Sequence, residues 1–155
     1  MKKTYPSLEK SGFVTHEPTL FYHGNAAVPL TDLTSYQKMK IVRDGVSKSY
    51  LTQLKEETSL DYDALAQALS VTRSTLINKK GDQKFNDHVS ERIIAVAELY
   101  SFGYEVFEDK DKFNKWMFAT NQALGGATPF DFMDNQFGRE EIRNLIGRIA
   151  YGVFS

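Results

Sequence analysis

The spacing of apolar residues from Thr31 onward is the feature that most limits how this chain can fold. These residues recur three and four positions apart, which places them on one face of an α-helix. The stripe formed by Val89, Ile93, Val96 and Tyr100 shows the pattern clearly. No stretch alternates between apolar and polar residues convincingly enough to predict a strand. We therefore expect an all-α protein.

Residues that cap helices, together with glycines, divide this pattern into separate helices. Gly45 is expected to end the first helix, and Gly103 is expected to interrupt the long helix that begins near His88. Pro129 suits the first turn of a helix, and the last helix is expected from about Arg139 to Tyr151. The residues predicted to begin or cap helices are Thr31, Ser47, Thr72, Asn86 and Thr128.

Three regions follow from the positions of these helices. Residues 1–30 hold three of the four prolines and show neither a helical nor a strand period, so we expect an irregular N-terminal arm. Residues 31–107 are expected to form one helical domain. Residues 108–155 are expected to form a smaller helical domain at the C-terminal end.

The composition excludes several classes of protein. The net charge of −1 gives no overall attraction to nucleic acid, so contact with DNA requires a local basic patch. The absence of cysteine excludes disulfides and thiolate chemistry. No run of about 18 apolar residues is present to cross a membrane. No apolar segment follows residues 1–6 as a secretory signal would require, so we expect a cytoplasmic protein.

Residues 59–80 fit a helix-turn-helix motif. Small Ala66 allows the two helices to cross closely, and a short break at Ser70 separates them. Val71 fills the corner, and Leu76 on the second helix is expected to face inward. Ser70 stands where glycine is usual in this turn. The second helix of such a motif presents its polar side to the major groove of DNA.

A basic and polar patch surrounds the second helix of this motif. Cations suit phosphate groups, and short hydroxyl and amide side chains suit base edges. A solvated basic face on an ordinary helix pair is the alternative interpretation. Because the chain has little net charge, useful affinity requires two copies on a repeated DNA site. The residues predicted to bind DNA are Thr72, Arg73, Ser74, Thr75, Asn78, Lys79, Lys80 and Lys84.

The last residues of the sequence are unusually apolar. Ile149, Tyr151, Val153 and Phe154 fall in a stretch where polar, poorly ordered residues are usual. Such a tail is expected to be buried, either in the core of its own chain or in a partner protein.

No group of residues has the spacing of a catalytic or metal site. The three histidines, His16, His23 and His88, are scattered along the chain. The Leu124-Gly125-Gly126 segment precedes a helix but lacks the lysine of a phosphate-binding loop. We therefore expect neither catalysis nor a bound cofactor or metal ion.

Several segments resemble the Xre/MbcA/ParS-type antitoxins. In the C-terminal part the resemblance rests on three elements: Leu-Gly-Gly-Ala-Thr-Pro from Leu124, Phe137-Gly138, and the run from Leu145 to Ser155. Upstream it rests on residues 43–46, 60–69, 72–76 and 79–80. The resemblance extends from about Leu33 to Ser155 and leaves only the arm uncovered.

This resemblance implies the antitoxin of a type II toxin–antitoxin system whose toxin carries a RES domain and depletes NAD. The chain would bind the toxin through residues 108–155, block its cleft, and repress its own operon through the helix-turn-helix domain of residues 31–107. NAD would belong to the toxin. The alternative is a helix-turn-helix regulator without a toxin, whose tail closes a homodimer interface. The implied toxin-binding residues are Arg148, Tyr151, Gly152, Val153, Phe154 and Ser155.

The apolar stripe of the long helix exceeds what the small N-terminal helices alone can cover. Part of it is expected to pack the two domains together, and the remainder to form a dimer seam. We expect a homodimer without toxin and a larger hetero-oligomer with it. The residues of this predicted stripe and seam are Val89, Ile93, Val96, Ala97, Tyr100, Phe113 and Trp116.

Overall fold

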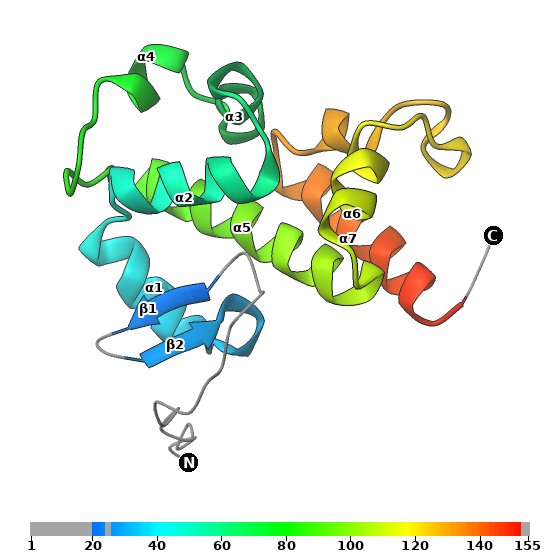
Figure 1. The fold of residues 1–155 in the computed structure, drawn as a ribbon, viewed down its shortest axis with the longest axis horizontal. Helices are drawn as coiled ribbons and strands as arrows, with labels where there is room; N and C mark the ends of the chain where they lie inside the picture. The colour runs from blue at the N-terminus through cyan, green and yellow to red at the C-terminus, as the bar shows by residue number, and fades with distance from the viewer. Residues whose placement is uncertain (1–19, 24–25, 153–155) are drawn as a thin grey trace.

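The longest helix, α5 (Asp87–Phe107), runs through the middle of the molecule and contacts most of the other helices (Figure 1). The structure is a computed structural model, which describes residues 20–23 and 26–152. The remaining elements are β1 (Leu20–His23), β2 (Ala26–Pro29), η1 (Leu30–Asp32), α1 (Ser35–Asp44), α2 (Lys48–Thr58), α3 (Tyr62–Leu69), α4 (Arg73–Ile77), α6 (Lys110–Met117), η2 (Gln122–Leu124), η3 (Pro129–Phe132) and α7 (Gln136–Ala150).

The all-α class predicted from the sequence is confirmed, with one addition in the arm. The strands β1 and β2 pair as an antiparallel hairpin in which Leu20 lies opposite Pro29. The predicted irregular arm is therefore wrong for these residues. The strands carry β-branched and aromatic residues, and the sequence between them is Gly24-Asn25, a pair typical of two-residue hairpin loops.

Most of the predicted caps are confirmed, because a cap is a contact between neighbours in sequence. Ser47, Thr72 and Asn86 each accept a hydrogen bond from the first turn of a helix, and Gly45 ends α1. The first helix is capped by Thr34 and not by Thr31, which lies in η1. Thr128 caps a short 3-10 helix. The last helix begins at Gln136, earlier than predicted.

The predicted interruption at Gly103 is wrong, since α5 continues through this residue to Phe107. A Cβ atom at position 103 would collide with the ring of Phe113 on α6. That ring is fully buried and packs edge-on against Tyr100 and Tyr104. Gly103 is therefore required by the packing of α6 onto α5 and does not break the helix.

One hydrophobic core extends from Leu30 to Ile146 and includes residues from both predicted domains. On one side α5 packs against α1, α2 and α3, and on the other against α6 and α7. The predicted boundary at residue 107 coincides with the end of α5, but the helix serves both halves.

The core also removes the basis of the predicted dimer seam. The five α5 residues of the stripe and Phe113 are buried within this single chain, and Trp116 is half-buried against Phe107 and Phe113. The prediction that part of the stripe is left for a second copy is therefore wrong. The two halves cover each other more completely than the sequence indicated. Within the described residues, none of the helices combines the length and apolar character needed to cross a membrane.

Candidate functional site

Helices α3 and α4 form the helix-turn-helix pair expected from the sequence. The N–H of Val71 donates to the carbonyl of Ala66 at 3.0 Å, which closes the turn between them. Ser70 lies in the left-handed region, with φ of 51°. Leu76 is buried as predicted and anchors α4, while Ile77 is exposed. The turn therefore has the geometry for which glycine is usual, adopted here by serine.

The start of α4 presents hydroxyl groups and a cation to solvent. Thr72 Oγ1 accepts from the N–H of Thr75 and lies 3.1 Å from Ser74 Oγ and 2.8 Å from Thr75 Oγ1. Arg73 forms an ion pair with Asp63 on α3, with 3.7 Å between nitrogen and oxygen and both side chains exposed. Such an exposed pair contributes little to stability, which leaves the guanidinium of Arg73 available to an anionic ligand.

The segment after α4 is fixed against the start of α2. Gly81 accepts hydrogen bonds through its carbonyl from the N–H of Ser49 at 2.9 Å and from Ser49 Oγ at 2.8 Å. The N–H of Lys48 donates to the carbonyl of Gln83 at 2.9 Å, and Ser47 forms an isolated β-bridge with Lys84. These bonds fix the backbone of the segment that carries Lys80 and Lys84.

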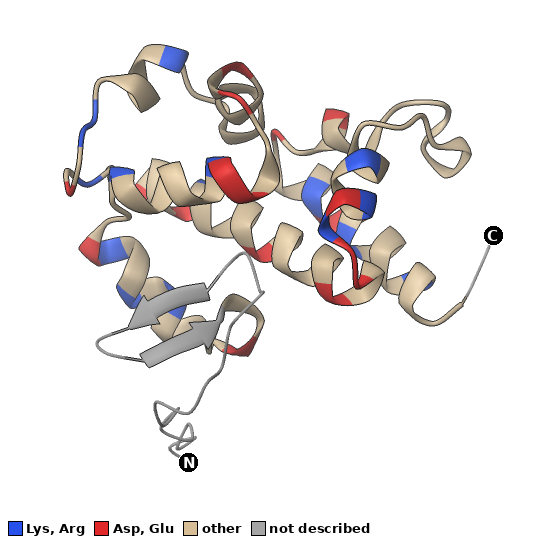
Figure 2. Ribbon diagram, viewed as in Figure 1, with Lys and Arg blue, Asp and Glu red and all other residues tan. Residues whose placement is uncertain are grey.

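All eight residues predicted to bind DNA lie on α4, its cap and this following segment. Seven of them are exposed, and Lys79 is half-buried. Figure 2 shows the basic residues at the start of α4 and along the segment that follows it. Asp82 is the one acid between Lys79 and Lys84. The arrangement offers cations for phosphates and short polar groups for base edges on one surface.

Lys48 supports this surface, although its position in the sequence does not indicate such a role. Its side chain is 8% exposed although it is charged. The ammonium group donates to the carbonyl of Leu76 near the end of α4 and lies 4.5 Å from the centre of the Tyr62 ring. The partners come from α3 and α4, so only the folded structure identifies the role of this lysine.

The residues predicted to bind the toxin lie around the end of α7. Tyr151 caps α7 and is 87% exposed, so it is not buried in the core of its own chain. Gly152 is also exposed. Arg148 is half-buried, and its Nε atom is buried without a hydrogen-bond partner among the described residues. The predicted residues Val153, Phe154 and Ser155 lie outside the described residues.

A carboxyl group with a shifted pKa lies where α2 meets α5 and α6. Burial raises the pKa of Glu57 to about 7, and the positive charge of Lys110 opposes this shift. Glu57 Oε2 is buried and has no hydrogen-bond partner among the described residues. Nearby, Tyr104 donates its hydroxyl proton to Asn114 Oδ1 at 2.6 Å. The described part of the chain contains no cluster of three or more His, Asp or Glu arranged to hold a metal ion.

Two family models match the chain, one on each half. The antitoxin Xre-like helix-turn-helix domain matches residues 38–98. The C-terminal toxin-binding domain of the Xre/MbcA/ParS antitoxins matches residues 103–152. The chain therefore belongs to the Xre/MbcA/ParS-type antitoxin family, which confirms the resemblance drawn from its sequence motifs.

Curated relatives agree with this assignment. An antitoxin Xre from Photorhabdus laumondii is 36% identical over 76 residues, which are 48% of this chain and 51% of the relative. An antitoxin Xre from Yersinia enterocolitica is 32% identical over 85 residues, 54% of this chain and 57% of the relative. The chain thus spans little more than half the length of each of these two relatives. A Prs ADP-ribosylating antitoxin from a Sphingobium species is 23% identical over 76% of this chain and 80% of its own length.

Proposed function

We propose that this chain is an antitoxin that binds and blocks a RES-domain toxin, and that it represses its own operon through α4. The observation that carries the proposal is the presence of both matched domains in one chain. Two of its relatives are named antitoxin Xre. A third relative is named Prs ADP-ribosylating antitoxin, which links that antitoxin to ADP-ribosylation. The proposed activity is binding and repression, and NAD belongs to the toxin.

Toxin binding is assigned to the end of α7 and the residues after it. Ile142, Leu145 and Ile146 bury the inner face of α7, so the position from which the tail leaves the helix is fixed. Tyr151 is exposed at that position, and Arg148 offers a guanidinium close by. A cleft that stacks nucleotide bases suits the exposed ring of Tyr151, and the guanidinium of Arg148 suits carboxylates or aromatic rings near the mouth of such a cleft.

Operon repression is assigned to α4 and the basic segment after it. A single helix-turn-helix of this size contacts only a few base pairs, so we propose that two copies bind related half-sites. The separation of half-sites for such dimers is about 34–36 Å or a multiple of it. This homodimer requires a surface other than the buried stripe of α5.

The experiment that tests the proposal is co-expression with the RES-domain toxin encoded in the same operon. The chain is expected to restore growth and the cellular NAD level, to co-purify with the toxin, and to shift operator DNA in a gel. A chain that shifts the DNA but neither binds nor neutralises the toxin is instead the regulator without a toxin partner. A chain that does neither contradicts the whole proposal.

A further inference from the structure

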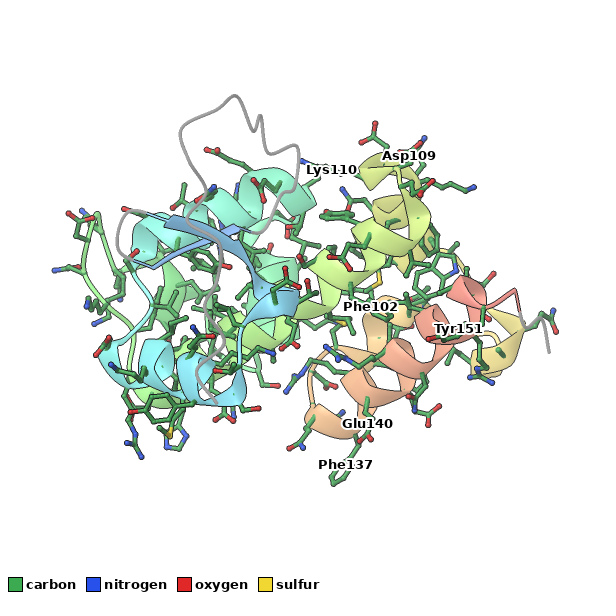
Figure 3. All side chains as sticks on the ribbon, turned by 90° about the horizontal axis from the view of Figure 1, so that it is seen from below. Phe102, Asp109, Lys110, Phe137, Glu140 and Tyr151 are labelled. Carbon is green, nitrogen blue, oxygen red and sulfur yellow. The ribbon has the colours of Figure 1, made fainter. Side chains whose placement is uncertain are left out.

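One face of α7 carries an exposed stripe that the core does not use. Phe137 begins the stripe and is 79% exposed, an unusual state for a phenylalanine. Tyr151 ends it at the other end of the helix, and Figure 3 shows Phe137 and Glu140 pointing away from the rest of the chain. The stripe spans about 21 Å at the helical rise per residue. Its members recur three and four positions apart: Phe137, Glu140, Asn144 and Tyr151 are exposed, and Gly147 between the last two is half-buried.

The opposite face of α7 holds this stripe in place. Ile142, Leu145 and Ile146 are buried against α5 and the rest of the core. A Cβ atom at Gly138 would collide with the carbonyl oxygen of Phe132, so the start of α7 packs directly on the η3 backbone. The stripe is therefore part of a rigid element, which binds a partner with less loss of conformational entropy than a loop.

The packing of the described residues does not require a glycine at position 147. Glycine is unfavourable inside a helix, and Gly103 and Gly138 each avoid a collision with a neighbouring element. A Cβ atom at Gly147, by contrast, would meet no atom within 4 Å. A glycine in such a position fits the close approach of another molecule to the helix backbone.

We propose that this stripe is the surface on which the toxin docks and that Gly147 is the point of closest packing. This inference rests on the function proposed above. If the residues after Tyr151 enter the toxin's cleft, the toxin must lie over the C-terminal turns of α7, where Gly147 is. The family model for toxin binding also includes the whole stripe.

The chemistry of the stripe defines the complementary surface of the toxin. Phe137 and Tyr151 are large exposed rings at the two ends and require two apolar pockets. Glu140 and its neighbour Glu141 are both exposed beside Phe137. The toxin is therefore expected to place basic side chains at the Phe137 end and a flat or bulky apolar group over Gly147.

The decisive variant is Gly147→Ala in the full chain, because docking predicts opposite effects on stability and on binding. The melting temperature of the chain alone is expected to rise by about 2 °C, since alanine favours the helix and meets open space. The affinity for the purified toxin is expected to fall by about tenfold or more, because the methyl group occupies the contact. Phe137→Ala is expected to weaken the same affinity by a similar factor without changing the melting temperature.

Tyr36→Ala is the matched control, since Tyr36 is an exposed ring on α1 and not on α7. It is expected to leave toxin affinity unchanged. If both variants, Gly147→Ala and Phe137→Ala, bind the toxin as tightly as the parent chain does, the proposed docking surface is wrong. The proposed function would remain intact in that case. A parent chain that fails to bind toxin contradicts the proposed function itself. If light scattering shows a dimer of the chain alone that both variants dissociate, the stripe is an interface between two copies and the proposal is wrong.

Discussion

Ser70 Oγ donates a hydrogen bond to the main-chain carbonyl of Asp134 at 2.7 Å, which joins the turn before α4 to the segment before α7. Arg92 on α5 adds to this contact through Nη1, which lies 3.2 Å from the Leu69 carbonyl and 3.3 Å from that of Ser70. A glycine would adopt the left-handed conformation of residue 70 more easily but would lose the bond to Asp134. The hydroxyl thus gives serine a role that glycine cannot fill.

Ser70→Ala is expected to destabilise the chain by about 1 kcal/mol, because it removes the bond and keeps the unfavourable backbone conformation. Ser70→Gly loses the same bond but relieves about 1 kcal/mol of backbone strain, so it is expected to remain close to the parent chain. Urea unfolding of both variants measures the difference. Equal midpoints for Ser70→Ala and the parent chain would show that the contact with Asp134 adds nothing to stability.

Gly103→Ala is expected to destabilise the chain by about 1–3 kcal/mol, since the new methyl group overpacks the buried ring of Phe113. This cost exceeds the gain of about 0.5–1 kcal/mol that alanine brings inside a helix. Thermal unfolding is the measurement, and Gly147→Ala is the matched control with the opposite expected sign. Adding Phe113→Leu should recover part of the loss. If the double variant is no more stable than Gly103→Ala alone, the contact with the Phe113 ring is not the cause of the lost stability.

Glu57 is expected to make the free energy of unfolding fall as the pH rises. Burial raises its pKa from 4.5 to about 7 in the folded chain, so the folded state holds this proton more tightly than the unfolded state does. The stabilisation is complete below about pH 4.5 and is lost as the pH passes through about 7. Urea unfolding between about pH 5 and about pH 8 should show a smaller decline for Glu57→Gln than for the parent chain. Glu141→Gln, at an exposed position on α7, is the control and should decline as the parent does.

Arg73→Ala, Lys80→Ala and Lys84→Ala are each expected to weaken operator binding, because each removes a proposed contact with a phosphate. Each should also reduce the slope of log affinity against log salt by about 1. Lys115→Ala removes an exposed lysine on α6 and is the control. Toxin neutralisation is expected to survive in all of these variants. Unchanged operator binding across the set would favour the interpretation of the basic patch as a solvated face.

Removal of residues 151–155 is expected to leave the helical content and the unfolding midpoint of the chain unchanged, since Tyr151 lies outside the core. The same truncation should abolish rescue of cells from the toxin. Circular dichroism and a growth assay are the two measurements. If the truncated chain fails to fold, the tail belongs to its own core and cannot enter a cleft of the toxin.

Features that depend on neighbouring residues were predictable from the sequence. The caps at Ser47, Thr72 and Asn86 each involve a side chain and an N–H three residues later, and the turn at Ser70 has the same local character. The eight candidate DNA-binding residues also follow from one continuous segment. Short-range geometry therefore explains why the sequence alone groups these candidate residues.

Features that depend on distant residues were not predictable. The glycine at position 103 interrupts a helical pattern when read alone, and only the ring of Phe113 explains why the helix continues. Lys48 has the composition of a surface residue, yet its ammonium group reaches the Leu76 carbonyl. The predicted dimer seam failed for the same reason, because the sequence does not show how completely α6 and α7 cover α5.

The continuity of α5 has a consequence for how such a protein is turned over. Its 21 residues supply buried side chains to both halves, so one cut in this helix by a protease would open the shared core in both halves together. A single cleavage would therefore abolish both proposed activities of the chain, which are toxin binding and repression. Under the proposed function, degradation of this chain would release the toxin and relieve repression in a single step, without any further signal between the two events.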